Sequence, residues 1–424
     1  MHKQGFKPAR KIARQLDEQD KLRELSDHFL IPDRTIYMLG NSLGLMCREA
    51  DDEVQSAMTE WREMAIDGWT EAEPPWFELG ERLGALQAPL VGAQEDEVVV
   101  MNSTTVNLHA LLLTFFGDRE EGKILADELN FPSDIYALKS HAPSPDQLVL
   151  VRSSDGKTLD ERDIAESITE DVDIVILSSV LYQSGQLLDM EYLTSKAHDN
   201  GALIGFDLSH SAGVVPHKLS DWEVDFAFWC TYKYLNGGPG SVASLYVNRR
   251  HHTLEPGMAG WWGSDKERQF EMSLDFTPAE TAGRWQVGTP HVLSMASLLG
   301  SLRVFQHTNI EKLREKSLRL TTYLMYLFER EVSDGEHRLH IITPRCPSKR
   351  GGHVAVENNE AWRICQAMKK RGIVADFRAP NTLRFAPSPL YTSFEQVWQV
   401  AEALKSIIDN KEYRQFSKQK DSVT

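Results

Sequence analysis

The sequence predicts an α/β protein with a large domain built on a mainly parallel, seven-stranded sheet, plus a smaller α+β domain. Three observations support this class. Seven short apolar runs lie between residues 97 and 247, helix-like polar segments separate most of them, and the pattern changes after residue 300. Continuous apolar runs that alternate with helices are typical of strands buried on both faces of a parallel sheet. The length of 424 residues also favours two domains over one core.

The seven predicted strands follow one another along the first part of the chain. They are EVVVM (97–101), KILAD (123–127), QLVLVR (147–152), DIVILSS (173–179), ALIGFDL (202–208), DFAFWC (225–230) and SVASLYV (241–247). Polar segments with helical spacing, such as LDERDIAESI and DMEYLTSKAHDNG, come between several of them. This order predicts repeated strand–helix–strand units.

The flanking segments predict a second unit. Helical spacing occurs over residues 11–30 and 48–66, and residues 68–77 (GWTEAEPPWF) are expected to form a loop. After residue 300, we expect an amphipathic helix over 311–333, short strands at LHIITP, HVAVEN and TLRFAP, and helices near 360–371 and 393–409, and we expect the end of the chain, EYRQFSKQKDSVT, to be frayed. We therefore divide the chain into an N-terminal segment associated with the small domain (1–75), a large domain (76–300), joined through a helix starting near Leu293, and a small domain (301–424).

Composition limits the classes of function. Lys and Arg number 46 against 62 Asp and Glu, so the net charge is −16, which argues against nucleic acid as the main partner and weakly against an anionic membrane. The four cysteines include no C-x-x-C pair, and H-E-x-x-H is absent, so neither a disulfide framework nor a metal site is expected. No signal peptide or membrane span is apparent, and we expect a cytoplasmic protein.

A lysine after the sixth strand is the first candidate for chemistry. Lys233 lies in WCTYKYLNGGPGS (229–241) between Tyr232 and Tyr234, before a loop rich in glycine. A solvated lysine at a strand end is one interpretation. The other is a Schiff-base lysine, because aromatic surroundings reduce hydration and make the neutral amine more accessible.

An aspartate at the end of another apolar run is the second candidate. Asp207 ends the strand-like part of FDLSHSAG (206–213), so its carboxylate is expected near the core, where an unpaired charge is costly. It either caps the following turn or pairs with a cation such as a protonated pyridine nitrogen. His210, three residues later, would lie beside the same group.

The third candidate is an anion site at a helix start. In VVVMNSTTVNLHALLL (98–113), Ser103, Thr104 and Thr105 lie between a strand and a helical run. Free N–H groups and the helix dipole attract a phosphate there, although ordinary capping explains the same residues. Neither G-x-x-x-x-G-K-[ST] nor G-x-G-x-x-G after a strand occurs, so no competing phosphate motif is present.

The order of these candidates resembles that of aspartate-aminotransferase-like enzymes that use pyridoxal 5′-phosphate (PLP), and more specific segments resemble the kynureninase family over essentially the full length. The matching segments are LGNSLGL (39–45), MNSTTVNLH (101–109), NFPSDIYA (130–137), FDLSHSAG, DFAFWCTYKYLNGGPG (225–240), GWWG (260–263) and RFAPSPLY (384–391). The resemblance implies fold type I, PLP as cofactor, and hydrolysis of the Cβ–Cγ bond of L-kynurenine or 3-hydroxykynurenine to L-alanine and an anthranilate. It also implies a homodimer with shared active sites, working in tryptophan catabolism or NAD precursor supply.

The resemblance also implies a role for individual residues. Lys233 would bind the cofactor aldehyde, Asp207 the pyridine nitrogen, and Arg384 the substrate α-carboxylate. Tyr232 would donate to the phosphate and relay a proton. Further implied cofactor contacts are Thr104, Thr105, Phe131 (stacked on the ring), Pro132, Ser133, Asp134, Ser178 and His210, with Trp261 and Thr289 reaching the phosphate from the neighbouring subunit; Ser42 and Trp69 lie at the substrate side.

Two positions, Trp69 and Thr289, differ from the animal members of the family. Trp69 stands where animal members tend to carry histidine, and Thr289 also follows the bacterial pattern, which affects the choice of substrate. Trp69 could also simply pack against Trp76.

Two other classes of protein remain as alternatives. A cysteine desulfurase shares the fold but needs a reactive cysteine on a mobile segment, for which Cys346 is the only candidate and Cys365 is not. A non-enzymatic PLP-binding protein would be expected to have lost Lys233, Asp207 or Arg384.

Overall fold

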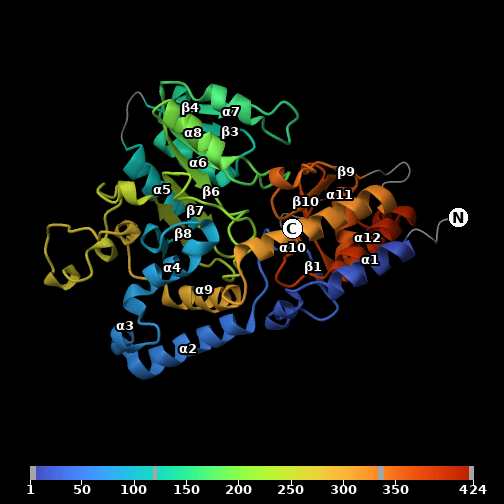
Figure 1. The fold of residues 1–424 in the computed structure, drawn as a ribbon, viewed down its shortest axis with the longest axis horizontal. Coiled ribbons are helices and arrows are strands. Elements are labelled where there is room, and N and C mark those ends of the chain that lie inside the picture. The colour runs from blue at the N-terminus through green and yellow to red at the C-terminus, as the bar shows by residue number, and fades with distance from the viewer. Residues whose placement is uncertain (1–5, 118–121, 333–338, 420–424) are drawn as a thin grey trace.

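The computed structural model describes residues 6–117, 122–332 and 339–419, and a seven-stranded sheet lies at its centre (Figure 1). The strand order is β2-β8-β7-β6-β5-β3-β4, and only β8 runs antiparallel to its neighbours. The strands are β2 (Val98–Met101), β3 (Lys123–Asp127), β4 (Leu148–Val151), β5 (Val172–Ser178), β6 (Leu203–Asp207), β7 (Phe226–Cys230) and β8 (Ala243–Val247). All seven predicted strands are confirmed.

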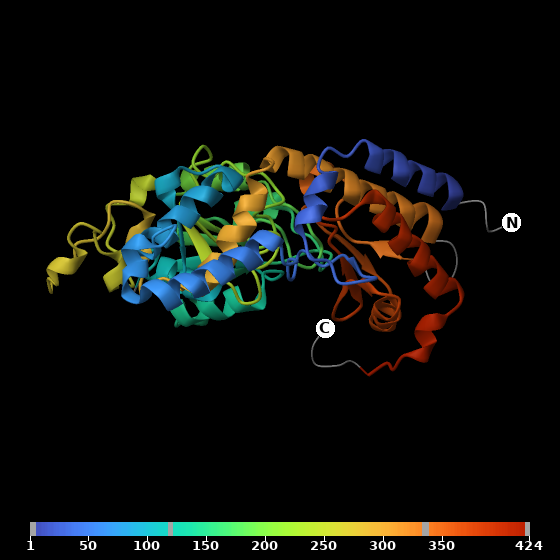
Figure 2. The ribbon, with the colours of Figure 1, turned by 90° about the horizontal axis from the view of Figure 1, so that it is seen from below.

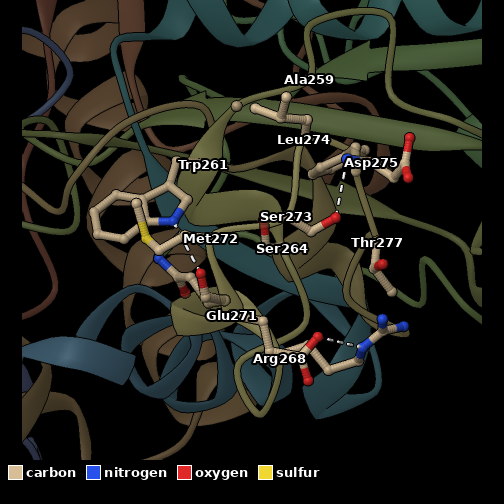
Figure 3. Close-up of a pocket in the computed structure, with 13 residues that line it drawn as sticks. Ala259, Trp261, Ser264, Arg268, Glu271, Met272, Ser273, Leu274, Asp275 and Thr277 are labelled. Atoms are coloured by element: carbon tan, nitrogen blue, oxygen red, sulfur yellow. Dashed lines mark hydrogen bonds and ion pairs between the residues drawn. The ribbon is translucent and has the colours of Figure 1, made fainter.

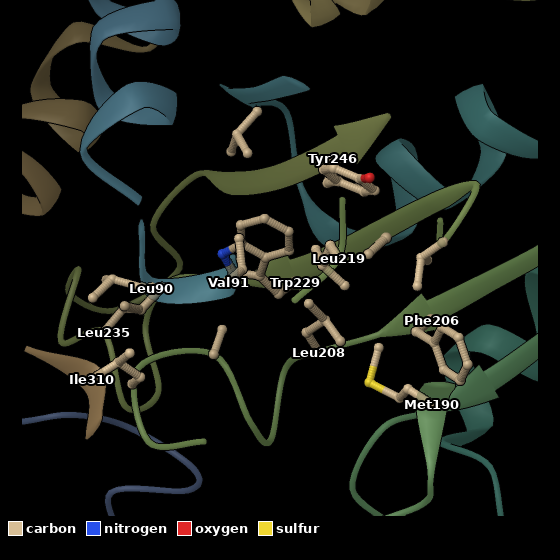
Figure 4. Close-up of a cluster of buried hydrophobic side chains, with 14 of the residues drawn as sticks. Leu90, Val91, Met190, Phe206, Leu208, Leu219, Trp229, Leu235, Tyr246 and Ile310 are labelled. Atoms are coloured by element: carbon tan, nitrogen blue, oxygen red, sulfur yellow. The ribbon is translucent and has the colours of Figure 1, made fainter. Parts of the chain in front are cut away.

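Helices cover both faces of this sheet, which explains the continuous apolar runs. Within β2, Val98 and Val100 belong to the core on one face, and Val99 and Met101 belong to the core on the other. The first core, part of which Figure 4 shows around Trp229, is completed by α4 (Leu79–Val91), α7 (Glu161–Ser167), α8 (Met190–Asp199) and α9 (Val292–Phe305). The second is completed by α5 (Thr104–Phe115) and α6 (Pro132–His141).

A separate hydrophobic core lies in the smaller α+β unit, at the right of Figures 1 and 2. Its antiparallel sheet has the order β12-β13-β10-β9, and a separate parallel pair joins β1 to β11. The elements are β1 (Ile36–Tyr37), β9 (His340–Ile341), β10 (Val354–Glu357), β11 (Ile373–Val374), β12 (Asp376–Arg378), β13 (Thr382–Phe385), α10 (Ile310–Leu327), α11 (Ala361–Lys370) and α12 (Phe394–Asp409). The predicted helices and strands of this unit are therefore present, whereas β1, β11 and β12 were not predicted.

The N-terminal segment contacts both units. Helix α1 (Phe6–Glu18) packs against α12, whereas α2 (Arg48–Met64) packs against α9. Gly300 permits the second contact, because a Cβ there would lie 2.2 Å from the carbonyl oxygen of Glu49. The domain boundaries at residues 75 and 300 remain a prediction.

Three local expectations were wrong. The helix expected over 11–30 stops at Glu18 and resumes as a 3₁₀ helix over Arg23–His28, because the Asp20 side chain accepts the Leu22 N–H at 3.0 Å. The loop expected over 68–77 contains the short helix α3 (Gly68–Glu71) and a 3₁₀ turn at Trp76–Glu78. The C-terminal segment is docked as far as Gln419, whose carbonyl accepts the Trp362 indole N–H at 3.1 Å. The expectation of fraying at 420–424 lies outside the described residues.

None of the helices in the described ranges is long and apolar enough to cross a membrane.

Candidate functional site

Most of the predicted site residues lie at the carboxyl edge of the large sheet. Ser178 ends β5, Asp207 ends β6, and Lys233 follows β7, while Thr104 opens the helix after β2 and Phe131 precedes the first residue of the one after β3. In open α/β sheets this edge is where ligands bind, because strand ends and helix starts converge there. The fold therefore collects residues that are far apart in the sequence into one site.

Lys233 is half-buried and held by a neutral histidine. Its Nζ lies 2.9 Å from Nε2 of His210, 5.8 Å from the Phe131 ring centroid and 6.0 Å from that of Tyr232. Burial, followed by the positive charge of Lys233, holds the pKa of His210 well below its usual range. Nε2 thus accepts from Lys233, and Nδ1 carries the proton. That Nδ1 is buried and has no partner among the described residues, so it is free to bind a ligand.

Asp207 is a buried carboxylate beside that lysine. It is 6% exposed, and its Oδ1 accepts the Ser209 N–H at 2.8 Å. Burial raises the pKa of Asp207, and the charge of Lys233 acts in the opposite direction. The turn-capping interpretation is therefore observed, and it coexists with a charged environment suited to a cationic ligand group.

The start of α5 has the features of an anion site. Ser103 occupies the N-cap position, but its side chain accepts no hydrogen bond from the helix, so ordinary capping does not explain it. The hydroxyls of Thr105 and Ser133 lie 2.8 Å apart and join the first turns of α5 and α6. Two helix N-termini and their hydroxyl groups therefore meet at one place.

The segment 130–134 closes this side of the site. Phe131 is 41% exposed and packs edge-on against Tyr182, with ring centroids 5.4 Å apart. Its neighbour Asp134 is buried, and Oδ2 of Asp134 has no partner within the described residues. Burial, followed by the charge of Asp207, raises the pKa of Asp134 well above its usual range. Both effects favour the protonated form of Asp134, which can donate one hydrogen bond.

The Ser178 hydroxyl donates to the Asn130 side chain at 3.1 Å, which ties β5 to the same segment. Pro132 sits in the first turn of α6, where its fixed φ suits a helix start.

The LGNSLGL segment lies directly against the lysine segment. The Gly44 N–H donates to the Tyr232 carbonyl at 2.7 Å, and a Cβ at Gly44 would lie 2.4 Å from the Lys233 carbonyl oxygen. Ser42 is part of the same turn, with its N–H on the Leu39 carbonyl at 3.0 Å. The close approach requires glycine at position 44.

Arg384 reaches the site from the small unit, but with a partner that the sequence did not predict. Its side chain is 1% exposed, and Nε donates to Asp376 at 2.8 Å while Nη2 donates to the other oxygen of Asp376. Nη1 donates to the Tyr182 carbonyl at 2.6 Å. The guanidinium is therefore fixed before any ligand binds.

Three predicted residues lie apart from this group. Trp69 and Thr289 line a cavity of about 500 Å³ together with Trp61 and Trp76. The Trp69 and Trp76 rings pack edge-to-face with centroids 5.7 Å apart, so the packing interpretation of Trp69 is observed. No hydrogen bond or ring contact within the described residues joins them to Lys233.

Trp261 lies on an arm formed by residues 257–280, which projects from the large unit in Figures 1 and 2. The arm encloses a cavity of about 350 Å³ (Figure 3), and the Trp261 indole N–H donates to the Gln269 carbonyl at 3.3 Å. Like Trp69 and Thr289, Trp261 has no described contact with Lys233.

Sequence reasoning missed Tyr182, His353 and Asp376. His353 is fully buried, its ring centroid lies 6.0 Å from that of His210, and burial lowers its pKa to about 3. Only Asp376 left a sequence signal, namely a carboxylate between the apolar residues of VADFR. Within the described ranges, no three or more His, Cys, Asp or Glu side chains are placed to hold a metal ion.

Comparisons with known proteins agree with this geometry. The family described as "Aminotransferase class-V" matches residues 82–340, and the "Kynureninase C-terminal domain" matches residues 313–404. A kynureninase from Geobacillus thermodenitrificans is 51% identical over 430 residues, and one from Bacillus cereus is 48% identical over 429 residues; each match covers 100% of both chains.

Solved structures of similar fold include a cysteine desulfurase from Thermococcus onnurineus, with a TM-score of 0.76 and 18% identity, covering 91% of this chain and 98% of that one. A cysteine desulfurase from Escherichia coli has a TM-score of 0.76 and 16% identity, with the same coverage. These two show the fold alone. In this chain Cys346 is exposed, Cys365 is buried in α11, and neither has a described contact with Lys233.

Proposed function

We infer the roles of the site residues from one premise: the chain belongs to the kynureninase family. It is a hydrolase of carbon–carbon bonds in ketonic substances and uses PLP to convert L-kynurenine or 3-hydroxykynurenine to L-alanine and the corresponding anthranilate. The observation that supports the assignment to this site is the Lys233 amine, held 2.9 Å from a neutral histidine beside Asp207.

The polar groups of the site fit the cofactor. The free first turn of α5, with Thr104 and Thr105, would hold the phosphate, and Ser133 and Tyr232 would add their hydroxyls. Asp207 would accept from the pyridine nitrogen, and Phe131 would cover the ring. The unpartnered His210 Nδ1–H and Asp134 carboxyl would each find a polar partner on the ring substituents.

Different residues of the site would perform different steps of the reaction. When bound, PLP supplies an electron sink that stabilises negative charge on carbons next to the substrate amine. Asp207 keeps the ring nitrogen protonated, and Lys233 moves the α-proton. Water adds to the γ-carbonyl, the Cβ–Cγ bond breaks, and the electron pair stays on Cβ, which takes a proton. Interaction with Cys230, followed by burial, raises the pKa of Tyr232, so its phenol stays protonated and can supply that proton.

Incubation of the purified protein with PLP and L-kynurenine tests the function. We expect anthranilate to appear by fluorescence, with one L-alanine for each anthranilate. Alanine released from L-cysteine, with no anthranilate from L-kynurenine, would instead support the desulfurase alternative.

We further propose that the active species is a homodimer. Trp261 and Thr289 would complete the partner's phosphate site, since both lie apart from Lys233 within one chain. Large apolar side chains are exposed around them, as an interface requires; they are Trp61, Phe270, Met272 and Leu274.

Mixing two inactive variants should restore activity. In a hybrid of Lys233→Ala and Trp261→Ala subunits, one site has neither change and the other has both. Random pairing should recover about one quarter of the wild-type activity per site, since half the dimers are hybrids and half their sites are intact. Activity is measured after mixing, with each variant alone as control. A monomer with full activity in sedimentation would contradict the proposal.

Trp69 is proposed to favour L-kynurenine over 3-hydroxykynurenine. An indole offers stacking area and one donor, and a substrate hydroxyl buried without a partner costs roughly 1–3 kcal/mol, on the order of ten- to a hundred-fold in kcat/KM. Trp69→His should reduce or reverse the preference, as measured by kcat/KM for both substrates. Equal preference in the natural protein contradicts this proposal, and an unchanged ratio in the variant favours packing against Trp76.

The wider setting is also a proposal. The low cysteine count supports a cytoplasmic enzyme, and the net charge of −16 supports a small-molecule partner rather than nucleic acid. The reaction would serve tryptophan catabolism or NAD precursor supply.

A further inference from the structure

Asp376 and Arg384 face each other across two strands of the small unit. They are directly paired in the antiparallel register of β12 and β13, and they are 2% and 1% exposed. Both oxygens of Asp376 accept from the guanidinium, one from Nε at 2.8 Å and the other from Nη2. A bidentate contact of this kind between an arginine and a carboxylate adds geometric specificity as well as binding energy.

The remaining donors of Arg384 are defined by these contacts. A guanidinium has five N–H groups, and Asp376 uses two of them. Nη1 gives a third to the carbonyl of Tyr182, which follows β5 of the large sheet, at 2.6 Å. One N–H on each terminal nitrogen is left without an acceptor among the described residues. These two are the donors available to a ligand carboxylate.

Asp376 also serves a second cation. Arg378 donates to its Oδ2 at 2.9 Å, and the Nε of Arg378 is buried without a partner in the described part of the chain. Although burial acts to raise it, the hydrogen bonds and charge of Arg384 hold the pKa of Asp376 below its usual range. One negative charge therefore sits between two positive ones, which leaves this corner of the site attractive to an anion.

We propose that Asp376 is a positioning residue that orients Arg384 towards the α-carboxylate of the substrate. This rests on the proposed role of Arg384 as the carboxylate ligand. The alternative is that the pair serves only the folding of the small unit, where removal of one partner of a buried ion pair is destabilising because it leaves the other charge unpaired. A second buried ion pair in the chain can serve as a control for that alternative: Asp20 and Lys316 pair at 2.7 Å, with side chains 5% and 6% exposed.

The test compares ligands with and without a carboxylate in Asp376→Asn holoenzyme. Binding of L-alanine and of ethylamine is followed by the absorbance of the bound cofactor, alongside KM and kcat for L-kynurenine. We expect the affinity for L-alanine to fall about ten-fold and KM to rise equally, with kcat within about two-fold and ethylamine binding unchanged. An unchanged affinity for L-alanine, or an equal loss for both ligands, would overturn the inference.

Three further variants complete the test. Asp376→Glu keeps the charge but displaces the oxygens, so it should shift L-alanine binding in the same direction even if Asp376→Asn does not fold. Asp20→Asn should lower Tm and leave both affinities unchanged. Arg384→Lys separates the two proposals, because unchanged L-alanine binding there refutes the role of Arg384. A loss in Arg384→Lys without one in the Asp376 variants refutes only the positioning role.

Discussion

Lys233→Ala should abolish the covalent link to PLP and lower kcat by at least about 10³-fold, since the variant loses both the nucleophile and the group that moves the α-proton. The natural protein should show an absorption band that borohydride removes, with the label fixed on Lys233. The variant should bind the cofactor only reversibly, so that dialysis after borohydride treatment leaves no cofactor label on the protein. Absorbance, peptide mapping and steady-state kinetics measure these effects.

Lys266 provides the matched control. It lies over two aromatic rings, 5.0 Å from the Phe77 centroid and 4.8 Å from that of Trp262, and burial lowers its pKa. By the criterion of aromatic surroundings alone, it is as good a candidate as Lys233. Lys266→Ala should keep the borohydride-sensitive band, because the described contacts of this lysine are with Trp262, Glu81 and Phe77 rather than with Asp207 or His210. A label on Lys266, or on any lysine except Lys233, would refute the assignment.

The strands of the large sheet were predictable because each face of the sheet is buried. Every residue of a run such as VVVM is apolar, and the structure places its alternate residues in two different cores, one on each face of the sheet. The strands β11 and β12 have only two and three residues, so their pairing depends on tertiary contacts that no local pattern reveals. The break after Glu18 likewise depends on Asp20, whose side chain also pairs with the distant Lys316.

The site was predictable where chemistry coincides with a strand end. Asp207 and Lys233 each interrupt or follow an apolar run, and the α5 start combines small hydroxyl residues with a helical pattern. The contact of Asp376 with Arg384 forms only when β12 pairs with β13, so no local pattern predicts it. Tyr182 contacts Arg384 through its backbone carbonyl, a group that every residue has, so its side chain gives no signal. Trp69, Trp261 and Thr289 came from the family resemblance alone, and within one chain they lie apart from Lys233.

The second large effect is expected for Asp207→Asn. A carboxylate paired with the pyridine nitrogen keeps that nitrogen protonated, whereas an amide of the same shape carries no charge to do so. We expect kcat to fall roughly 10²–10⁴-fold, the range for losing control of a proton in the transition state. Cofactor binding should persist, since the phosphate site at α5 and Lys233 are unchanged. Kinetics and the cofactor absorbance together measure this effect.

Asp127 is the geometric counterpart of Asp207 and serves as its control. It ends β3 as Asp207 ends β6, it is fully buried, and its Oδ1 accepts the N–H two residues later, from Leu129, at 2.9 Å. Burial raises the pKa of Asp127 to about 7, so the residue is largely neutral in slightly acidic buffer. Asp127→Asn therefore removes little charge, and kcat should stay within about three-fold of the natural value. If both variants lost activity equally, the effect would come from the shared turn geometry, and the role of Asp207 at the ring nitrogen would be refuted. If only Asp207→Asn lost activity, the reaction would depend on the negative charge at the end of β6 and not on the turn geometry that the ends of β3 and β6 share.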